Sequence, residues 1–466
     1  MKKLLLLFVL LLTVNIMYSQ DITGDWYGTL EIPGAKLRMV LHINEAEKGY
    51  EATLDSPDQG ANGIPVAKTE FVENNLRLEL PNIMAVYTGT LKDGKFEGIF
   101  NQMGQELKLD FSKEKSEGPK RPQHPTEPFP YKSEEVTFQN KEQDVTLAGT
   151  LTLPEKGNAF AAAILITGSG PQNRDEEILE HKPFLVIADY LTRHGIAVLR
   201  YDDRGVGEST GEFSGATSAD FATDVEAAFS YLKTRKEINS KRIGLIGHSE
   251  GGMIAPMVAT KHKNVAFVVM LAGTGVDLGE VLLVQQEKIF EAIGYDEEFI
   301  KINKEVNTEA YQLIRDTKDA NELESKLESY FTDAIRKYPN FNSQINQGVS
   351  NKEYIQMLVD TYTDPWMRYA ISHDPAVDLK KVKCPVLALN GTNDLQVDAA
   401  QNLTAIKSAL AKGKNKKVTI HELEGLNHLF QESETGLPTE YGLIEETFSP
   451  TALEIMKDWI LEKALK

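Results

Sequence analysis

At 466 residues, the chain is too long for one typical domain and has room for two or three. Its 41% hydrophobic and 26% charged residues are typical of a soluble globular protein. The formal net charge of −19 argues against nucleic acid or an anionic membrane surface as a partner. Acidic residues are scattered along the whole chain, so we interpret this charge as an aid to solubility.

The first twenty residues have the pattern of a secretory signal peptide. Two lysines precede an unbroken apolar run at 4–12, which is too short to span a bilayer. Cleavage is expected near Ser19 or Gln20. The only cysteine, Cys384, lies far downstream, so we expect neither lipid attachment near the signal nor an intrachain disulfide. These features predict a periplasmic or secreted bacterial protein with no membrane span.

Residues 21–114 are predicted to form a small N-terminal all-β domain. Apolar and polar residues alternate over 37–43 and 76–80, which is typical of strands with one buried face. The pair Asp93-Gly94 is a hairpin turn signal. An opening Trp26 followed by meandering strands resembles small lipocalin-like barrels. We expect a structural or substrate-presenting module, with a ligand-binding barrel as the alternative.

The stretch 115–131 is predicted to be a linker. Its prolines lie among charged and polar residues, a composition that stays extended and fairly stiff. These prolines are Pro119, Pro122, Pro125, Pro128 and Pro130. The chain is therefore expected to fold as separate units on either side of this stretch.

From residue 132 onward the pattern changes to that of an α/β fold. Two strand-like runs, at 134–139 and 145–153, come first. Continuous apolar runs then alternate with segments of helical periodicity, as in a mostly parallel sheet with helices on both faces. The continuous runs are 161–166, 196–199, 243–246, 265–271, 386–389 and 418–420. The sequence therefore predicts an α/β domain over 132–466.

One pentapeptide within this domain carries the strongest chemical signal. An apolar strand at 242–246 leads into Gly247-His248-Ser249-Glu250-Gly251, and a helix-like segment follows at 252–259. A strand, Gly-x-Ser-x-Gly and a helix together predict a nucleophile elbow with Ser249 at its tip. The alternative is an ordinary strand-to-helix connection with a capping serine.

About a hundred residues interrupt the alternation of strands and helices. The segment 276–380 contains helix-like runs and no strand pattern. An insertion at this point would lie over the carboxyl ends of the strands, so we predict a helical cap. A helical bundle without a role at the site is the alternative.

A serine nucleophile needs a base and an acid that orients the base. After the strand 386–389, a loop carries Asp394, which we predict to be the acid, with Asp398 as the runner-up that caps the next helix. Only two histidines follow Asp394. His421 lies inside the last strand and is expected to be packed, whereas His428 lies on the loop beyond it. We predict that His428 is the base, because serine, aspartate and histidine then follow in the expected order.

The oxyanion donors are predicted from the loop after the strand 161–166. The amide of Ser169 is expected to act with that of Glu250, and Gly170 is the second choice for the first donor. The loop lacks the third glycine of a dinucleotide site, and the chain has neither His-Glu-x-x-His nor a cysteine pair. We predict no metal and no cofactor.

These motifs, taken together, resemble the α/β-hydrolase superfamily, specifically bacterial carboxylesterases grouped with serine aminopeptidase-like hydrolases. The resemblance covers 132–466 apart from the predicted cap and rests on 168–175, 201–209, 247–252, 390–394 and 425–428. It implies the α/β-hydrolase fold, and it implies that Asp203 and Arg204 shape a loop beside the site without being catalytic. Pro256, in the helix after the nucleophile, departs from helix preference. The N-terminal domain receives no function from the resemblance.

The sequence thus predicts a secreted serine hydrolase, foremost a carboxylesterase that cleaves short-chain acyl esters of small molecules through an acyl-enzyme. A serine peptidase of the aminopeptidase type or a thioesterase would use the same triad, and a catalytically inactive binding protein is the remaining alternative. Trp366, Tyr369 and Tyr354 are candidates for an acyl pocket or for a core. An aminopeptidase would also need carboxylates for the substrate amine. The candidates in the predicted cap are Glu287, Glu291, Glu305 and Glu309, whose spacing equally suits solvated helix faces. The oligomeric state is left open.

Overall fold

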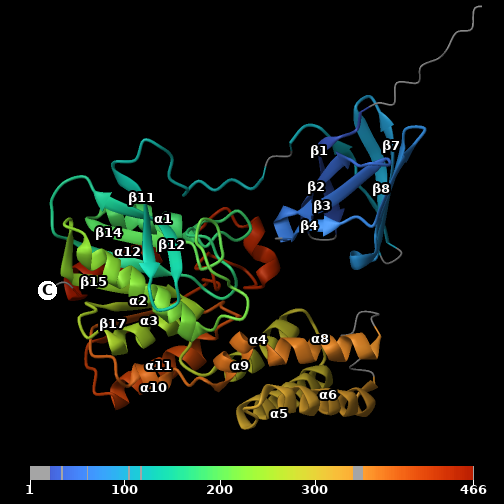
Figure 1. Cartoon of the computed structure of the whole chain (residues 1–466). Coiled ribbons are helices and arrows are strands. Elements are labelled where there is room, and N and C mark those ends of the chain that lie inside the picture. The colour runs from blue at the N-terminus through green and yellow to red at the C-terminus, as the bar shows by residue number, and fades with distance from the viewer. Residues whose placement is uncertain are drawn as a thin grey trace, which may run out of the picture. The chain divides into compact units, whose positions relative to one another are not determined.

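The chain divides into two compact units, Met1–Gly118 and Pro119–Lys466. A computed structural model describes residues 21–32, 35–59, 61–102, 105–115, 118–339 and 350–464 (Figure 1). The predicted signal peptide, residues 1–20, lies outside these ranges. Within them, no helix is both long enough and apolar enough to cross a membrane.

The first unit is a ten-stranded antiparallel sheet, as the alternating pattern predicted. Its strands pair in the order β4-β3-β2-β1-β10-β8-β7-β6-β5, and β9 pairs with β8 beside β10. The strands are β1 (Gly24–Ile32), β2 (Ala35–Glu45), β3 (Tyr50–Ser56), β4 (Ala61–Pro65), β5 (Lys68–Val72), β6 (Asn75–Leu80), β7 (Ala85–Lys92), β8 (Lys95–Gln102), β9 (Gln105–Lys108) and β10 (Phe111–Ser112). Single 3-10 turns occur at η1 (Pro57–Gln59) and η2 (Pro81–Ile83).

Aromatic side chains contribute to the buried core of this sheet. The ring centroids of Trp26 on β1 and Phe96 on β8 lie 4.5 Å apart, and the Trp26 indole donates a 2.7 Å hydrogen bond to the carbonyl oxygen of Ile22. Tyr50 on β3 contacts Phe71 on β5, with centroids 6.2 Å apart, although six strands separate β3 from β5 in the pairing order. The sheet therefore curls until its two ends approach each other.

The second unit contains an eight-stranded sheet in the order β11-β12-β14-β13-β15-β16-β17-β18. The first two strands pair antiparallel, and β13 to β18 are parallel, as predicted. The strands are β11 (Tyr131–Asn140), β12 (Val145–Pro154), β13 (Phe160–Ile166), β14 (Ile196–Tyr201), β15 (Ile238–His248), β16 (Val268–Leu271), β17 (Val386–Gly391) and β18 (Val418–Leu423). Strands β14, β16 and β17 are buried along their whole length, which explains their continuous apolar sequences.

Helices cover both faces of this sheet (Figure 1). Residues of α2, α3 and α11 share one core with the sheet, and residues of α1 and α12 share the other. These helices are α1 (Pro183–Arg193), α2 (Ser218–Thr234), α3 (Glu250–Lys261), α11 (Ala399–Lys412) and α12 (Pro450–Trp459), with a 3-10 segment η3 (Pro438–Leu443) and a final π-helical turn η4 (Ile460–Ala464). The second unit therefore has the α/β-hydrolase fold that the sequence predicted.

A bundle of helices is inserted between β16 and β17, where the segment 276–380 was predicted to be helical (Figure 1). Its described helices are α4 (Leu278–Ala292), α5 (Glu297–Asp316), α6 (Ala320–Lys337), α8 (Asn351–Thr363) and α9 (Pro365–Ser372), and the short α10 (Ala376–Leu379) leads back to the sheet. Tyr311 and Phe331 both pack against Tyr362 in a cluster of buried apolar residues, so the insertion has a core of its own. We call α4 to α9 the helical insertion.

The predicted linker is divided between the two units. The boundary falls after Gly118, and the remainder, 119–131, packs on the second unit. The Arg121 guanidinium donates hydrogen bonds to three carbonyl oxygens that are distant in the sequence, those of Leu179 at 3.0 Å, Gly442 at 2.9 Å and Ile444 at 2.7 Å. Arg121 thus attaches this part of the predicted linker to the second unit. The proline-rich composition did not indicate such an attachment.

Arg121→Ala should destabilise the second unit, because it removes charged donors from three carbonyl oxygens. We expect a loss of about 1.5–3 kcal/mol in the free energy of unfolding. For a unit of this size this corresponds to a fall of about 2–4 °C in the melting temperature measured by calorimetry. Lys120→Ala, which changes an exposed neighbour, is the matched control and should leave the melting temperature unchanged. Equal effects of the two substitutions would contradict this account of the segment.

Candidate active site

The sharp turn after β15 places Ser249 in strained backbone geometry. Its φ is 51° and its ψ is −116°, and α3 begins at the next residue. A Cβ atom on Gly247 would lie 2.0 Å from the carbonyl oxygen of Gly251, and one on Gly251 would lie 2.2 Å from that of Ile166. Only glycine fits at these two positions, which is the physical reason for the Gly-x-Ser-x-Gly pattern. The structure therefore places Ser249 at an elbow between β15 and α3.

The predicted acid and base lie together at the carboxyl edge of the sheet. Asp394 follows β17, His428 follows β18, and Nδ1 of His428 lies 2.9 Å from Oδ2 of Asp394. The other carboxylate oxygen accepts the amides of Gln396 and Val397, both at 2.8 Å. Because a buried carboxylate accepts hydrogen bonds, Nδ1 of His428 is the protonated nitrogen and Nε2 is the free acceptor.

The two alternative residues, Asp398 for the acid and His421 for the base, lie in different environments from Asp394 and His428. Asp398 caps α11 by accepting the amide of Gln401 at 2.7 Å, and it pairs with Lys288. His421 lies on β18, as predicted, but its side chain is exposed, so the expectation that it is packed was wrong. The reason is that β18 is the last strand of the sheet and has a neighbour on only one side.

Ser249 and His428 line one pocket with both predicted oxyanion residues, Ser169 and Glu250. As the first residue of α3, Glu250 has an amide without a helical acceptor. The rest of the lining is mostly apolar or uncharged and comes partly from α4 and α9. It comprises Ser218, Met253, Thr274, Leu278, Val281, Leu282, Gln285, Trp366, Ala370, Gln396 and Val397.

The side chain of Glu250 connects the elbow to the helical insertion. Its Oε1 accepts the hydroxyl of Ser218 at 2.6 Å and the indole N–H of Trp366, on α9, at 2.8 Å. Burial raises the pKa of the Glu250 carboxyl, and these two donors act in the opposite direction. The sequence assigned Glu250 only a backbone role, because one glutamate in an acidic chain gives no sign of burial.

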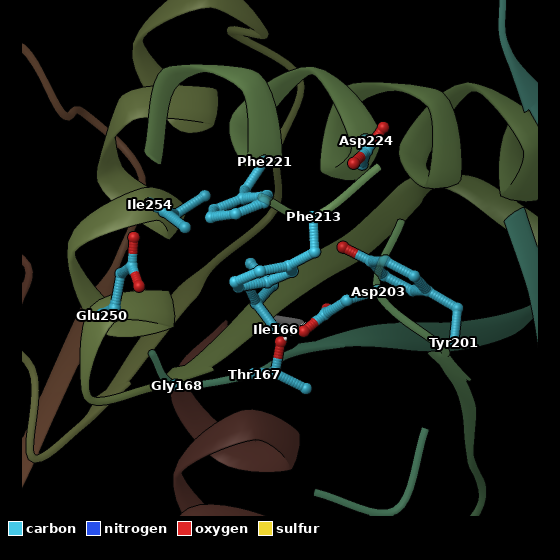
Figure 2. Close-up of a pocket in the computed structure, with 10 residues that line it drawn as sticks. All are labelled: Ile166, Thr167, Gly168, Tyr201, Asp203, Phe213, Phe221, Asp224, Glu250 and Ile254. Carbon is cyan, nitrogen blue, oxygen red and sulfur yellow. Dashed lines mark hydrogen bonds between the residues drawn. The ribbon is translucent and has the colours of Figure 1, made fainter. Parts of the chain in front are cut away.

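Glu250 also lines a second, small cavity (Figure 2). Figure 2 shows Phe213 and Phe221 over one side of it and the neighbouring side chains of Thr167 and Asp203 below. Asp203 accepts the Thr167 hydroxyl at 2.8 Å and the amide of Gln172 at 3.0 Å. Burial raises the pKa of Asp203 to about 8. Asp203 thus holds both ends of the predicted oxyanion loop, in agreement with the shaping role that the resemblance implied.

Another buried carboxylate, that of Glu176, was missed by the sequence reasoning. Its Oε1 accepts the amide of Gly168 at 2.7 Å and lies 3.0 Å from Nδ1 of His248. Glu176 has a positive φ of 50° and is almost fully buried. It stands in the run Arg174-Asp175-Glu176-Glu177, where the sequence alone does not distinguish buried from solvated acids.

Most of the candidate aromatic and acidic residues of the insertion do not line the pocket. Of the three aromatic candidates only Trp366 lines it, while Tyr369 stacks on His373 with centroids 5.3 Å apart. Glu287 pairs with Lys304 at 2.8 Å. None of the four glutamates, Glu287, Glu291, Glu305 and Glu309, is among the residues that line this pocket. Their spacing reflects helix surfaces, which was the simpler of the two interpretations.

Comparison with known proteins gives one family and several partial relatives. The family model described as serine aminopeptidase, S33, matches residues 181–434. Esterase EstD of Thermotoga maritima is 35% identical over 157 residues, which are 33% of this chain and 37% of EstD. An uncharacterised 31.7 kDa protein of Escherichia coli is 26% identical over 228 residues, which are 48% of this chain and 72% of that protein. The alignment thus spans little more than a third of the length of EstD.

A search of solved structures gives α/β-hydrolases of low identity. The esterase Pf2001 of Pyrococcus furiosus matches with a TM-score of 0.41 and 15% identity, covering 72% of this chain and 94% of that one. An α/β-hydrolase of Penicillium, GrgF, matches with a TM-score of 0.43 and 18% identity, covering 72% of this chain and all of that one.

The strain at position 249 can be measured with two variants that both lack the hydroxyl. Ser249→Gly should be more stable than Ser249→Ala by about 1–3 kcal/mol, because glycine accepts a positive φ without a clash. Denaturant unfolding of the second unit measures the difference. At Ser230, exposed within α2, the same pair of substitutions is the control, and glycine should there be less stable than alanine by about 1 kcal/mol. The same order at both positions would contradict the strained elbow.

Proposed function

Because the chain belongs to the serine aminopeptidase S33 family of α/β-hydrolases, we propose that it is a serine carboxylesterase that acts on short-chain acyl esters. The observation that carries this proposal is the His428–Asp394 pair in contact at 2.9 Å, with His428 lining the same pocket as Ser249. The name of EstD as an esterase supports it. The proposal assigns Ser249 as nucleophile, His428 as base and Asp394 as the residue that orients the base.

The proposed reaction begins at the hydroxyl of Ser249. Its oxygen forms a bond to the ester carbonyl carbon while Nε2 of His428 takes the hydroxyl proton. Asp394 stabilises the imidazolium through Nδ1. Collapse of the tetrahedral intermediate breaks the bond to the alcohol, which leaves with the proton from His428. Water then attacks the acyl-serine by the same route and releases the acid.

The negative charge of the intermediate needs preorganised donors. The amide of Glu250 is suited because it is the first amide of α3, and the amide of Ser169 lies on the loop after β13. Loss of one such donor typically lowers turnover about 10²–10³-fold. The oxyanion assignment is therefore part of the proposal and concerns backbone groups only.

The pocket lining favours a neutral acyl group. Apolar side chains such as Met253, Leu278 and Val281 dominate it, and the lining contains no lysine or arginine. The carboxyl of Glu250 is its one acidic group, and Ser218 and Trp366 already donate to one of its oxygens. An uncharged, short acyl chain is the substrate class that this lining suits best.

A peptidase with the same triad is the second candidate, because the family takes its description from aminopeptidases. An aminopeptidase must hold a free ammonium group beside the scissile bond. The glutamates proposed for this purpose, such as Glu287 and Glu305, pair with lysines on the surface of the insertion. This geometry supports an esterase over an aminopeptidase.

The helical insertion is proposed to be the cap of this site. Leu278, Val281 and Leu282 reach the pocket from α4, and Trp366 and Ala370 reach it from α9. These contacts would limit the depth available to an acyl chain. The sequence of the first twenty residues further supports a periplasmic or secreted enzyme, which N-terminal sequencing of the mature protein would test.

Removal of the nucleophile or the base should abolish turnover while the fold survives. We expect Ser249→Ala and His428→Ala each to lower kcat about 10⁴–10⁶-fold, and Asp394→Asn about 10⁴-fold. A fluorophosphonate probe should label Ser249 alone. Asp398→Asn is the matched control, since Asp398 caps α11, and it should leave kcat unchanged. Substantial turnover by the Ser249→Ala variant would end the proposed mechanism.

The substrate class can be tested with a panel of chromogenic compounds. We expect kcat/KM to be highest for acetyl or butyryl p-nitrophenyl esters, lower for the octanoyl ester and lowest for alanine and proline p-nitroanilides. Esters have the better leaving group, whereas an amide nitrogen must be protonated as it departs. Faster cleavage of an anilide than of every ester would favour the peptidase and leave the triad assignment intact.

A further inference from the structure

A chain of buried hydrogen bonds connects the oxyanion loop to the loop of the base. It begins at the amide of Gly168, which donates to Oε1 of Glu176 at 2.7 Å. The same oxygen lies 3.0 Å from Nδ1 of His248. On the far side of the ring, Nε2 of His248 lies 2.9 Å from the carbonyl oxygen of His428. Glu176 and His248 are both buried, so water does not replace these contacts.

The atoms at each end determine the protonation of His248. A carbonyl oxygen can only accept, so Nε2 of His248 carries a hydrogen. A carboxylate oxygen has lone pairs for two donors, so Oε1 of Glu176 can accept Nδ1–H of His248 in addition to the amide of Gly168. His248 is therefore an imidazolium paired with the Glu176 carboxylate. Burial alone would lower the pKa of His248, but the attraction of Glu176 outweighs it and the pKa is raised.

We propose that Glu176 and His248 form a positioning pair. The pair fixes the oxyanion loop and the loop that carries His428 in place relative to each other. This inference rests on the proposed function, since it assigns the pair a purpose in that reaction. Gly168 directly precedes Ser169, so fixing its amide fixes the direction of the next peptide unit. His248 directly precedes Ser249 and holds the backbone of His428. The oxyanion loop, the elbow that carries Ser249 and the loop that carries His428 are thus all connected to one ion pair.

Other ionisable groups surround the pair. The His428 and His248 rings are 4.8 Å apart between centroids, and Asp394 lies beyond His428. Asp203 is also near the pair, since the negative charge of Glu176 adds to the effect of burial in raising the pKa of Asp203. Because the pair itself is neutral overall, His428 gains a fixed backbone without a net charge beside it. Loss of the carboxylate alone would leave a buried cation next to the base, which is costly.

Glutamine at position 176 would keep the shape of the glutamate side chain and remove the negative charge that balances His248. Its amide oxygen could accept from both Gly168 and Nδ1 of His248, but His248 would then be an uncompensated cation. If His248 became neutral, one of its two nitrogens would lose its hydrogen and one connection would break. The substitution therefore separates the positioning effect from simple packing.

The experiment compares Glu176→Gln with Glu177→Gln in the full chain, using p-nitrophenyl acetate. Glu177 is the exposed neighbour and serves as the matched control. We expect Glu176→Gln to lower kcat about 10–100-fold with little change in KM, because His428 and the oxyanion loop are then no longer fixed relative to each other. We also expect the alkaline limb of its kcat/KM profile to lie about 1–3 pH units lower, since His248 loses its opposite charge. The same kcat and pH profile in both variants would overturn the proposal.

Proton NMR of the unmodified protein provides a measurement that does not depend on turnover or on the folding of a variant. At neutral pH, two strongly deshielded imidazole protons are expected, one between His428 and Asp394 and one between His248 and Glu176. His428→Ala should remove the first and leave the second. Absence of the second resonance in the unmodified protein would refute the ion pair. Turnover that survives in the Ser249→Ala variant would refute the proposed function instead, while the resonance would still report on the pair.

Discussion

Backbone segments meet at the nucleophile elbow with no side chain between them, and the geometry of the site depends on that contact. A Cβ atom on Gly251 would lie 2.2 Å from the carbonyl oxygen of Ile166 at the end of β13. One on Gly252 would lie 2.6 Å from Cα of Gly273, just after β16. The elbow is thus wedged between the two strands that flank β15. This confinement maintains a strained conformation at Ser249 that would relax in an isolated peptide.

Around this elbow, three buried carboxyl groups bind donors from other segments of the chain rather than one another. Asp203 binds both ends of the oxyanion loop, Glu176 binds its Gly168 amide, and Glu250 binds side chains from α2 and α9. Burial raises the pKa of Asp203 and of Glu250, which favours their neutral forms. Glu176 is instead balanced by His248. Little unbalanced charge therefore surrounds the pocket, so that charge developing in the proposed reaction would interact chiefly with the amides and His428.

The order of strands and helices could be predicted from the sequence because each element has a recognisable local pattern of apolar and polar residues. Buried parallel strands appear as continuous apolar runs, and the position of Asp394 and His428 after two such runs was enough to place them at one edge of the sheet. The pairing of Glu176 with His248 could not be predicted, since it joins residues 72 positions apart and depends on which acid is buried. The exposure of His421 likewise depends on the strand order. Anchoring of the predicted linker by Arg121 depends on carbonyl groups more than 300 residues away.

The double role of Glu250 has a consequence for the helical insertion. Its backbone begins α3 directly after Ser249, and its carboxyl accepts the indole of Trp366 from α9. A displacement of α9 would remove the indole donor and leave the Ser218 hydroxyl bonded to this buried carboxyl. Leaving a buried polar group without its partner costs about 1–3 kcal/mol, so the position of the insertion and the conformation at the elbow are energetically coupled. The insertion is therefore held to the elbow by the hydrogen bond from Trp366 to Glu250 as well as by the apolar side chains that line the pocket. The acceptor of this hydrogen bond, Glu250, is itself a residue of the elbow.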